Sequence, residues 1–280
     1  MKVLRALVTV SLAIMIVLPS VAQKRSKDQK GKKEYKLHLF KKPTDITTDD
    51  ISISMKDAMA ESEVIKFRAK VTNNTEDFII WDLGQASIKA NGESKATTKT
   101  KAVVIGPFKD KGKTLEIVGS GLKVDEFSAN LGGFVRVPVK GKTMSAPDFA
   151  LPASQNSFST GPFSCNMTHL KKKTDLTTAR FDCTYKGKTY GLIDPSKVAV
   201  RMSNGQEFAN VMRKEKSHLL KRGEKEKFTL YFEVPAKVED MQFANMQIVW
   251  NDCFVESKGV DLKTPTADFE LDPGLTEGKN

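Results

Sequence analysis

Cysteine spacing gives the clearest indication of covalent chemistry in this chain. Cys165 and Cys183 flank the polar run Lys171–Asp175 symmetrically, and Cys253 lies far downstream. A hairpin turning within this run would place Cys165 opposite Cys183, where cross-strand Cβ atoms lie within disulfide range. The alternative is that all three cysteines are small buried apolar side chains. We expect a Cys165–Cys183 disulfide and an unpaired Cys253.

The residues that usually bind metals or attack substrates do not form a recognisable motif. His38, His169 and His218 stand alone, without Cys-x-x-Cys or His-Glu-x-x-His spacing. Ser120 lacks the spacing of a nucleophile elbow, and no calcium-loop pattern follows Asp49-Asp50. The sequence therefore predicts no catalytic residue, metal site or cofactor. A hydrolase whose site follows no known pattern is kept as a second alternative.

Trp81 is the one candidate for a ligand contact. Ile79, Ile80 and Trp81 are consecutive, so a strand must expose at least one of them unless both of its faces are covered. An exposed tryptophan could stack on a sugar ring or anchor a partner protein. The alternative, which we favour, is that a neighbouring domain or a loop covers the run.

These residues lie in segments whose apolar period is two, as in half-buried antiparallel strands. Two such segments share the same pattern. Their apolar positions are Ile65, Phe67, Ala69 and Val71 in the first and Ala179, Phe181, Cys183 and Tyr185 in the second. Each continues through a polar turn and a further strand to an Asn-Gly turn, Asn91-Gly92 or Asn204-Gly205. Any two β-domains share alternation, but the same order of elements predicts an internal duplication.

Many short strands without crossover helices predict an all-β protein of two consecutive immunoglobulin-like antiparallel β-sandwich domains. We expect the first sandwich at residues 37–150 and the second at 157–260, joined by a linker over Pro147–Asn156. Asp57–Lys66 is the one candidate for a helical turn or two. Residues 261–280 are acidic and contain Pro and Gly, which predicts a flexible tail docked at most through Phe269 and Leu271.

The first 22 residues have the three regions of a secretory signal peptide: Lys2 and Arg5, the apolar run Leu7–Leu18, and a small-residue cleavage site before Gln23. Cleavage there lowers the formal charge from +11 to +9. Residues 23–36 are rich in lysine and predict a flexible basic tether, with peripheral membrane contact at most. We expect an exported protein of the periplasm or cell surface, and no nucleic-acid partner.

The second half contains a segment with a family resemblance. Leu219-Leu220-Lys221-Arg222-Gly223-Glu224 is followed by a strand that closes on Phe232-Glu233-Val234-Pro235. This pattern resembles telokin-like, immunoglobulin-type domains of secreted bacterial proteins. The resemblance implies a fold and an extracytoplasmic setting, and it carries no catalytic motif.

Taken together, these features predict a non-catalytic, exported binding or scaffolding protein of the bacterial envelope. Its partner would be an envelope protein or polysaccharide, and the sequence leaves the ligand and the oligomeric state open. A polysaccharide-binding module is the main alternative. That function would call for several exposed aromatic side chains on one face, and the sequence offers Trp81, with Tyr185, Tyr190 and Tyr231 as further candidates.

Overall fold

The computed structural model describes residues 35–211 and 217–277, and nearly all of its regular structure is antiparallel β-sheet. This confirms the all-β expectation. The predicted signal peptide and residues 23–34 of the predicted tether lie outside the described residues. No helix within the described ranges is both long and apolar enough to cross a membrane.

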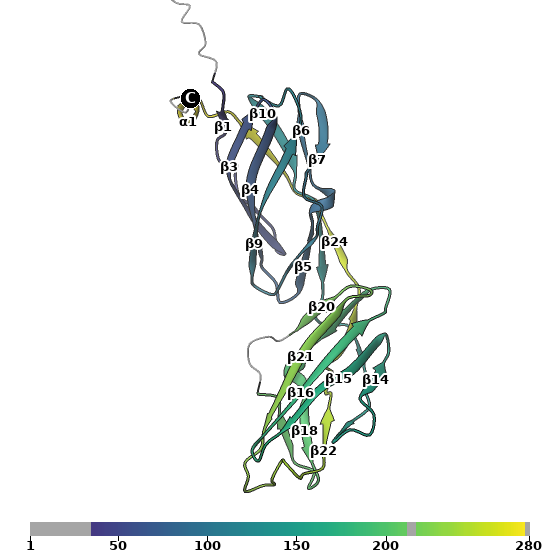
Figure 1. Cartoon of the computed structure of the whole chain (residues 1–280). Helices are drawn as coiled ribbons and strands as arrows, with labels where there is room; N and C mark the ends of the chain where they lie inside the picture. Colours follow the sequence, from purple (N-terminus) through teal and green to yellow (C-terminus); the bar gives the residue numbers. More distant parts are fainter. Residues whose placement is uncertain (1–34, 212–216, 278–280) are drawn as a thin grey trace, which may run out of the picture. The chain divides into compact units, whose positions relative to one another are not determined.

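The strands fall into two groups, each surrounding its own hydrophobic core (Figure 1). We call these groups the first and second modules. The first module contains β1 (His38–Leu39), β2 (Ile46–Thr47), β3 (Ile51–Glu61), β4 (Val64–Asn73), β5 (Phe78–Asp82), η1 (Leu83–Gln85), β6 (Ser87–Ala90), β7 (Glu93–Ala96), β8 (Val103–Ile105), β9 (Asp110–Val118), β10 (Glu126–Asn130), β11 (Gly133–Val137), β24 (Val260–Leu262), β25 (Thr266–Glu270) and the short helix α1 (Pro273–Thr276).

The second module is continuous in sequence. It contains β12 (Lys142–Met144), β13 (Phe149–Leu151), β14 (Ser157–Thr160), β15 (Phe163–Lys172), β16 (Leu176–Tyr185), β17 (Tyr190–Ile193), η2 (Pro195–Lys197), β18 (Ala199–Met202), β19 (Glu207–Ala209), β20 (His218–Leu220), β21 (Lys225–Glu233), β22 (Met246–Val249) and β23 (Phe254–Ser257).

The two modules have the same sheet topology. Each has a large sheet, β1-β3-β4-β9 with β2 on β3 in the first and β14-β15-β16-β21 in the second. Each also has a sheet that we call the junction sheet, β24-β11-β5-β8 or β12-β23-β17-β20, and one that we call the distal sheet, β25-β10-β6-β7 or β13-β22-β18-β19. Strand for strand, the orders match, in agreement with the repeat expected from the sequence.

Alternation explains where the two cores lie. The inward side chains of β4 and β16 are buried, and basic and polar side chains alternate with them on the outer face. The strand pairing matches the facing pair Ile53 and Val71 of the first module with Cys165 and Cys183 of the second. The apolar pattern of the sequence matches Val71 with Tyr185 instead, so the two alignments differ by two residues. Both large sheets carry a β-bulge at the matching place, between Lys56 and Met59 and between Met167 and His169.

The segment expected to hold a helical turn is part of this bulged hairpin. Asp57 has φ of 57° at the bulge, and Val64 begins β4, so Asp57–Lys66 contains strand and turn rather than helix. The bulge inserts extra residues into β3, and this breaks the regular period of two that would have identified the strand.

The end of the chain differs from the expected flexible tail. β24 pairs with β11 and β25 pairs with β10, so these strands close the sheets of the first module (Figure 1). Ala267 and Phe269 are buried and alternate with exposed Asp268 and Glu270. The acidic residues that suggested a solvated tail occupy the outer positions of a strand.

The expected linker also contains structure. Phe149–Leu151 forms β13, which pairs with β22, and Lys142–Met144 forms β12, which pairs with β23. The chain passes between the modules over residues 138–141 and returns over 258–259. The second module is therefore inserted between β11 and β24 of the first, and the two groups of strands do not follow the consecutive boundaries expected from the sequence.

Candidate functional site

A disulfide joins Cys165 and Cys183, the pair expected from the hairpin spacing. The two residues are direct partners in the β15–β16 ladder, with a Cα–Cα distance of 4.1 Å. Cys253 is free and buried in the second core, where burial raises the pKa of its thiol well above the usual range. A thiol held protonated in this way is a poor nucleophile, so Cys253 acts as a packing residue.

Trp81 is buried rather than exposed, so the structure does not place it where a ligand could stack. Its indole Nε1–H donates a hydrogen bond to the Leu131 carbonyl at 2.6 Å, and its ring stacks on Phe134. Ile79 faces the same core, and Ile80 on the opposite face of β5 is 3% exposed. Both faces of β5 are covered, which was the favoured explanation for the apolar run.

The cover over Ile80 is an apolar cluster formed by both modules. Its buried members are Phe78, Ile80, Val137, Leu192 and Val255. Val135, Tyr190 and Leu219 are among the partly buried side chains packed against it. The cluster lies on the outer faces of the two junction sheets, which therefore pack against each other. We call it the junction cluster.

The junction cluster is built from matching positions in the two modules. β5 pairs with β11 as β17 pairs with β23, and this register aligns Ile80 with Leu192 and Val135 with Val255. By the same register, Phe78 corresponds to Tyr190. Contact between the same patch of two equivalent units is the pattern of an isologous, two-fold interface.

Two glycines allow the crossing segments to pass close to this cluster. Gly141 precedes β12 directly, and Gly259 precedes β24. A Cβ atom on Gly259 would lie 2.6 Å from Val135 Cγ1, and one on Gly141 would lie 3.0 Å from Val255 Cγ1. Equivalent glycines thus pack on equivalent valines, and neither position has room for a larger residue.

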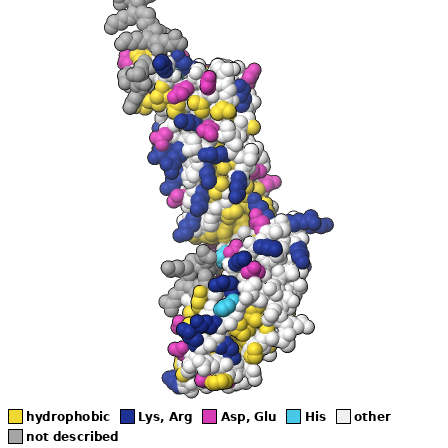
Figure 2. Space-filling view, in the orientation of Figure 1, with side chains coloured by type: hydrophobic (Ala, Val, Ile, Leu, Met, Phe, Trp, Pro, Cys, Tyr) yellow, Lys and Arg dark blue, Asp and Glu magenta, His cyan; other side chains and the backbone are white. Residues whose placement is uncertain are grey.

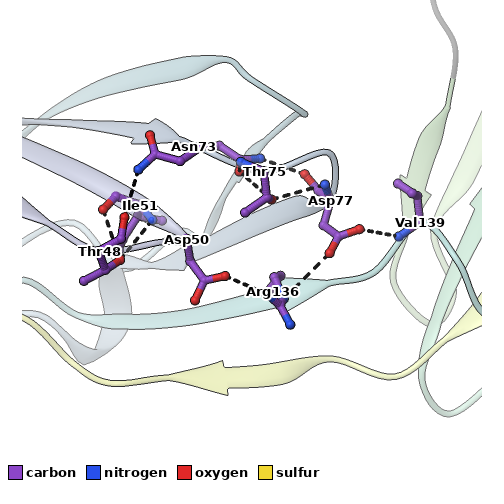
Figure 3. A network of polar contacts seen from close by, with 9 residues as sticks. Thr48, Asp50, Ile51, Asn73, Thr75, Asp77, Arg136 and Val139 are labelled. Carbon is purple, nitrogen blue, oxygen red and sulfur yellow. Dashed lines mark hydrogen bonds and ion pairs between the residues drawn. The ribbon is translucent and has the colours of Figure 1, made fainter.

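A charged network lies beside the junction cluster in the first module (Figure 3). Arg136 Nη1 donates to Asp50 Oδ1 at 2.7 Å, and Arg136 Nε lies 3.7 Å from Asp77 Oδ2. Asp77 Oδ1 accepts the backbone N–H of Val139 at 2.9 Å, within the segment that crosses to the second module. Asn73 donates to the Asp77 carbonyl and fixes the turn that carries this carboxylate. The network thus ties the crossing segment to the first module.

The matching position in the second module carries the opposite charge. Glu256 aligns with Arg136, because both residues follow the Phe-Val pair of the equivalent strand. Glu256 Oε1 accepts the Tyr185 hydroxyl at 2.7 Å and the Thr189 hydroxyl at 3.2 Å. Burial raises the pKa of the Tyr185 phenol, and the hydrogen bond to Glu256 adds to this rise. The equivalence of Arg136 and Glu256 could have been found from the sequence, since each follows a Phe-Val dipeptide, Phe134-Val135 or Phe254-Val255.

Open grooves lie on the distal sheets at matching positions. In the first module a groove of about 720 Å³ runs over β6, β10 and β25 and is lined by Lys89, Asn91, Glu126, Ser128, Asp268 and Glu270, among others. In the second, a groove of about 450 Å³ runs over β18, β22 and β13 and is lined by Arg201, Ser203, Asn245, Gln247, Ala150 and Pro152, among others. We call these the first and second grooves.

The strand pairings align the two linings residue by residue. Lys89 pairs with Ser128 as Arg201 pairs with Gln247, so each groove has a basic residue beside a polar floor. Opposite that floor, the first groove carries Asp268, whereas the second carries Ala150. The first groove is therefore the more acidic of the two. Its hydroxyl, amide and carboxylate groups suit hydrogen bonding to a polar polymer.

Polar contacts lie beside both grooves. Glu270 forms an ion pair with Lys41 at 3.1 Å, and His38 Nδ1 lies 3.3 Å from Asp125 Oδ1 and 2.9 Å from the Val124 carbonyl at the rim of the first groove. Arg201 bridges Asp148 at 2.8 Å and Glu207 at 2.9 Å beside the second. Within the described part of the chain, no three His, Cys, Asp or Glu residues are grouped in a way that could hold a metal ion.

The visible face of the molecule carries Lys and Arg side chains along its length (Figure 2). They are interspersed with acidic and hydrophobic side chains rather than gathered in one patch.

Comparison with known proteins gives little further information. No protein-family model matches the chain, and no curated protein matches it. Among solved structures, the chain is similar to the yjhA protein from Bacillus subtilis, with 14% sequence identity and a TM-score of 0.27. That similarity covers 34% of this chain and 77% of the other.

Proposed function

We propose that this chain is an exported, non-catalytic binding or scaffolding protein of the bacterial envelope, in which both modules are immunoglobulin-like domains and the second is of the telokin-like type. The observation that carries this proposal is the pair of open grooves on matching distal sheets. Two equivalent binding sites on one chain can raise overall affinity for a repeating or multivalent partner without any new contact.

The disulfide supports the extracytoplasmic part of the proposal. Disulfides persist in oxidising compartments and are rare in the cytosol, so a Cys165–Cys183 bond fits an exported protein. Residues 1–22 provide the export signal in this proposal. N-terminal sequencing of the secreted protein should begin at or near Gln23, and retention of Leu7–Leu18 would contradict it.

A polysaccharide is the second candidate partner, and the groove linings favour it. Asn91, Ser128 and Asp268 in the first groove, with Asn245 and Gln247 in the second, offer the hydroxyl, amide and carboxylate groups that bind sugar hydroxyls. The partner would then be recognised by hydrogen bonding rather than by stacking on Trp81, which is buried.

Binding measurements with groove-filling variants test the proposal. Purified mature protein is titrated with peptidoglycan fragments, lipopolysaccharide, capsular polysaccharide and purified envelope proteins. Ser128→Tyr and Gln247→Tyr fill the two groove floors, and Thr114→Tyr on the outer face of β9 is the matched control. We expect the double groove variant to lose about tenfold or more in affinity, and the control to lose little. Equal binding by the double groove variant and the control, or binding of the mature protein to no envelope component, would contradict the proposal.

A further inference from the structure

In each module, the outermost strands of the junction and distal sheets follow directly after a strand of the other module in the chain. We call these outermost strands the closing strands. In the second module, the outermost strands of the junction and distal sheets are β12 and β13, which follow β11 of the first module. In the first module, the same positions are filled by β24 and β25, which follow β23 of the second. Each module thus gives its partner the strands that complete it.

The two crossings are alike in detail. Each passes through a glycine that packs on the valine of the equivalent strand, Gly141 on Val255 and Gly259 on Val135. The modules then meet through matching side chains in the junction cluster. Exchange of an identical element between two equivalent units across a two-fold contact is the arrangement of a domain-swapped dimer. This chain contains that arrangement within one molecule.

The two closing pairs are not equally constrained. β12 and β13 are held on both sides, by the segment after β11 and by the segment leading to β14. β24 and β25 are connected to the second module through Lys258 and Gly259, and each pairs with one strand, at the edge of its sheet. In the described residues they lead to α1 and to no further strand, so their release breaks one ladder in each sheet.

The site that receives this segment is specific. Phe269 stacks on Phe127 at a centroid distance of 4.4 Å and lies 4.8 Å from Phe67. Phe127 in turn packs edge-on against Phe40 at 4.8 Å, and the Phe40–Leu271 bridge continues the pairing beyond β25. Release of the segment would expose this aromatic cluster, so an empty first module would be a strong acceptor for an identical strand.

We propose that residues 260–277 of one molecule can close the first module of a second copy of the chain, and that reciprocal exchange produces a dimer. The contacts made by the segment are the same in the closed and exchanged forms. The ratio of exchanged dimer to closed monomer is therefore set by protein concentration and by the conformation of the two-residue crossing segment. Because this segment is short, a change that strains it disfavours the closed monomer. The proposal does not depend on the ligand-binding function proposed above.

A cross-linking experiment with two isotopic forms of the mature protein tests the exchange. Ser128 and Asp268 are direct partners across β10 and β25, with side chains on the outer face, so Ser128→Cys with Asp268→Cys can form a disulfide across that ladder. Unlabelled and ¹⁵N-labelled proteins are unfolded without reductant, refolded together at high concentration, oxidised and digested. Gln247→Cys with Ala150→Cys provides the matched pair across β22 and β13.

We expect 128–268 cross-linked peptides that join a labelled to an unlabelled chain, in a fraction that falls on dilution. The 247–150 pair should give peptides from single chains. Gly259→Ala places a Cβ against both Val135 of the first module and Tyr190 of the second. It should raise the mixed fraction about tenfold, because after exchange residue 259 is no longer held between the two modules of one chain. Gly141→Ala is the control and should not raise it.

Two outcomes would overturn the proposal. One is efficient 128–268 cross-linking with no mixed-label peptides at any concentration, which would show that each segment always closes its own chain. The other is failure of the pair to cross-link while the 247–150 pair does so. If Gly259→Ala does not fold, the variant with Ser128→Cys and Asp268→Cys alone still distinguishes exchange from closure within one chain.

Discussion

The two modules share one topology but stabilise matching positions with different chemistry. At the centre of the large sheet, Ile53 and Val71 face each other in the first module, where the second has the Cys165–Cys183 disulfide. Beside the junction, Arg136 holds two carboxylates in the first module, whereas Glu256 accepts hydroxyls in the second.

This difference shows which features the topology requires. The inward period of two, the bulge in the large sheet and the glycine before each closing strand occur in both modules. The residue types of the facing core pair and the sign of the charge beside the junction cluster differ between the modules. The first module depends on aromatic packing by the segment that returns from the second, and the second depends on a covalent bond within its own hairpin.

The largest effect should come from the closing strands. Phe269 aligns with Leu151, since β25 pairs with β10 as β13 pairs with β22, and both side chains are 1% exposed. Phe269→Ala should lower the free energy of unfolding by about 4 kcal/mol and Leu151→Ala by about 3 kcal/mol, measured by denaturant unfolding. Asp268→Ala, on the exposed face of β25, is the control. A loss no larger for Phe269→Ala than for this control would show that β25 is not part of the first core.

The disulfide should have the next largest effect, confined to the second module. Cys165→Ala with Cys183→Ala should cost about 3 kcal/mol, because the bond constrains a short loop of the unfolded chain. Thiol counting on denatured, unreduced protein should give one free thiol, from Cys253. Ile53→Cys with Val71→Cys sharpens the comparison, since the matching register should allow a second disulfide. Three free thiols would contradict the account.

A smaller effect should distinguish the two junction networks. Arg136→Met removes the cation between Asp50 and Asp77 and should cost about 1 kcal/mol, since the side chains are partly exposed and water screens the pair. This loss should shrink as salt is added. Glu256→Gln keeps an acceptor for Tyr185 and should show a smaller cost with little dependence on salt. Equal salt dependence in both variants would remove the distinction.

The smallest effect concerns alkaline pH and should be larger in the second module, which holds two of the three tyrosines with a raised pKa; the third, Tyr35, lies beside Glu277 at the end of α1. Burial raises the pKa values of Tyr185 and Tyr190, whereas the aligned residues Asn73 and Phe78 do not titrate. A raised phenol pKa stabilises the folded state below about pH 10, and that contribution is lost as pH rises through the folded pKa values. The second module should therefore unfold first on alkaline titration, as followed by tyrosine absorbance. Earlier unfolding of the first module would contradict this order.

The sequence was sufficient for the features that depend on local pattern. Alternation predicted the all-β class, and the symmetric spacing around Lys171–Asp175 predicted the register of Cys165 and Cys183. The closing strands could not be assigned in this way, because a three-residue strand such as β24 does not identify the sheet edge that it joins. The Ile79–Trp81 run illustrates the same limit, since the burial of Ile80 depends on cover that β5 receives from the other module.

The most direct test of the account is amide hydrogen exchange in β24 and β25. Their backbone groups pair with β11 and β10 as those of β12 and β13 pair with β23 and β22. The account predicts that amides of residues 260–262 and 266–270 that face a ladder are as protected as the matching amides of 142–144 and 149–151. Exchange of residues 260–270 at the rate of an unstructured chain, with protection retained at 142–151, would contradict it.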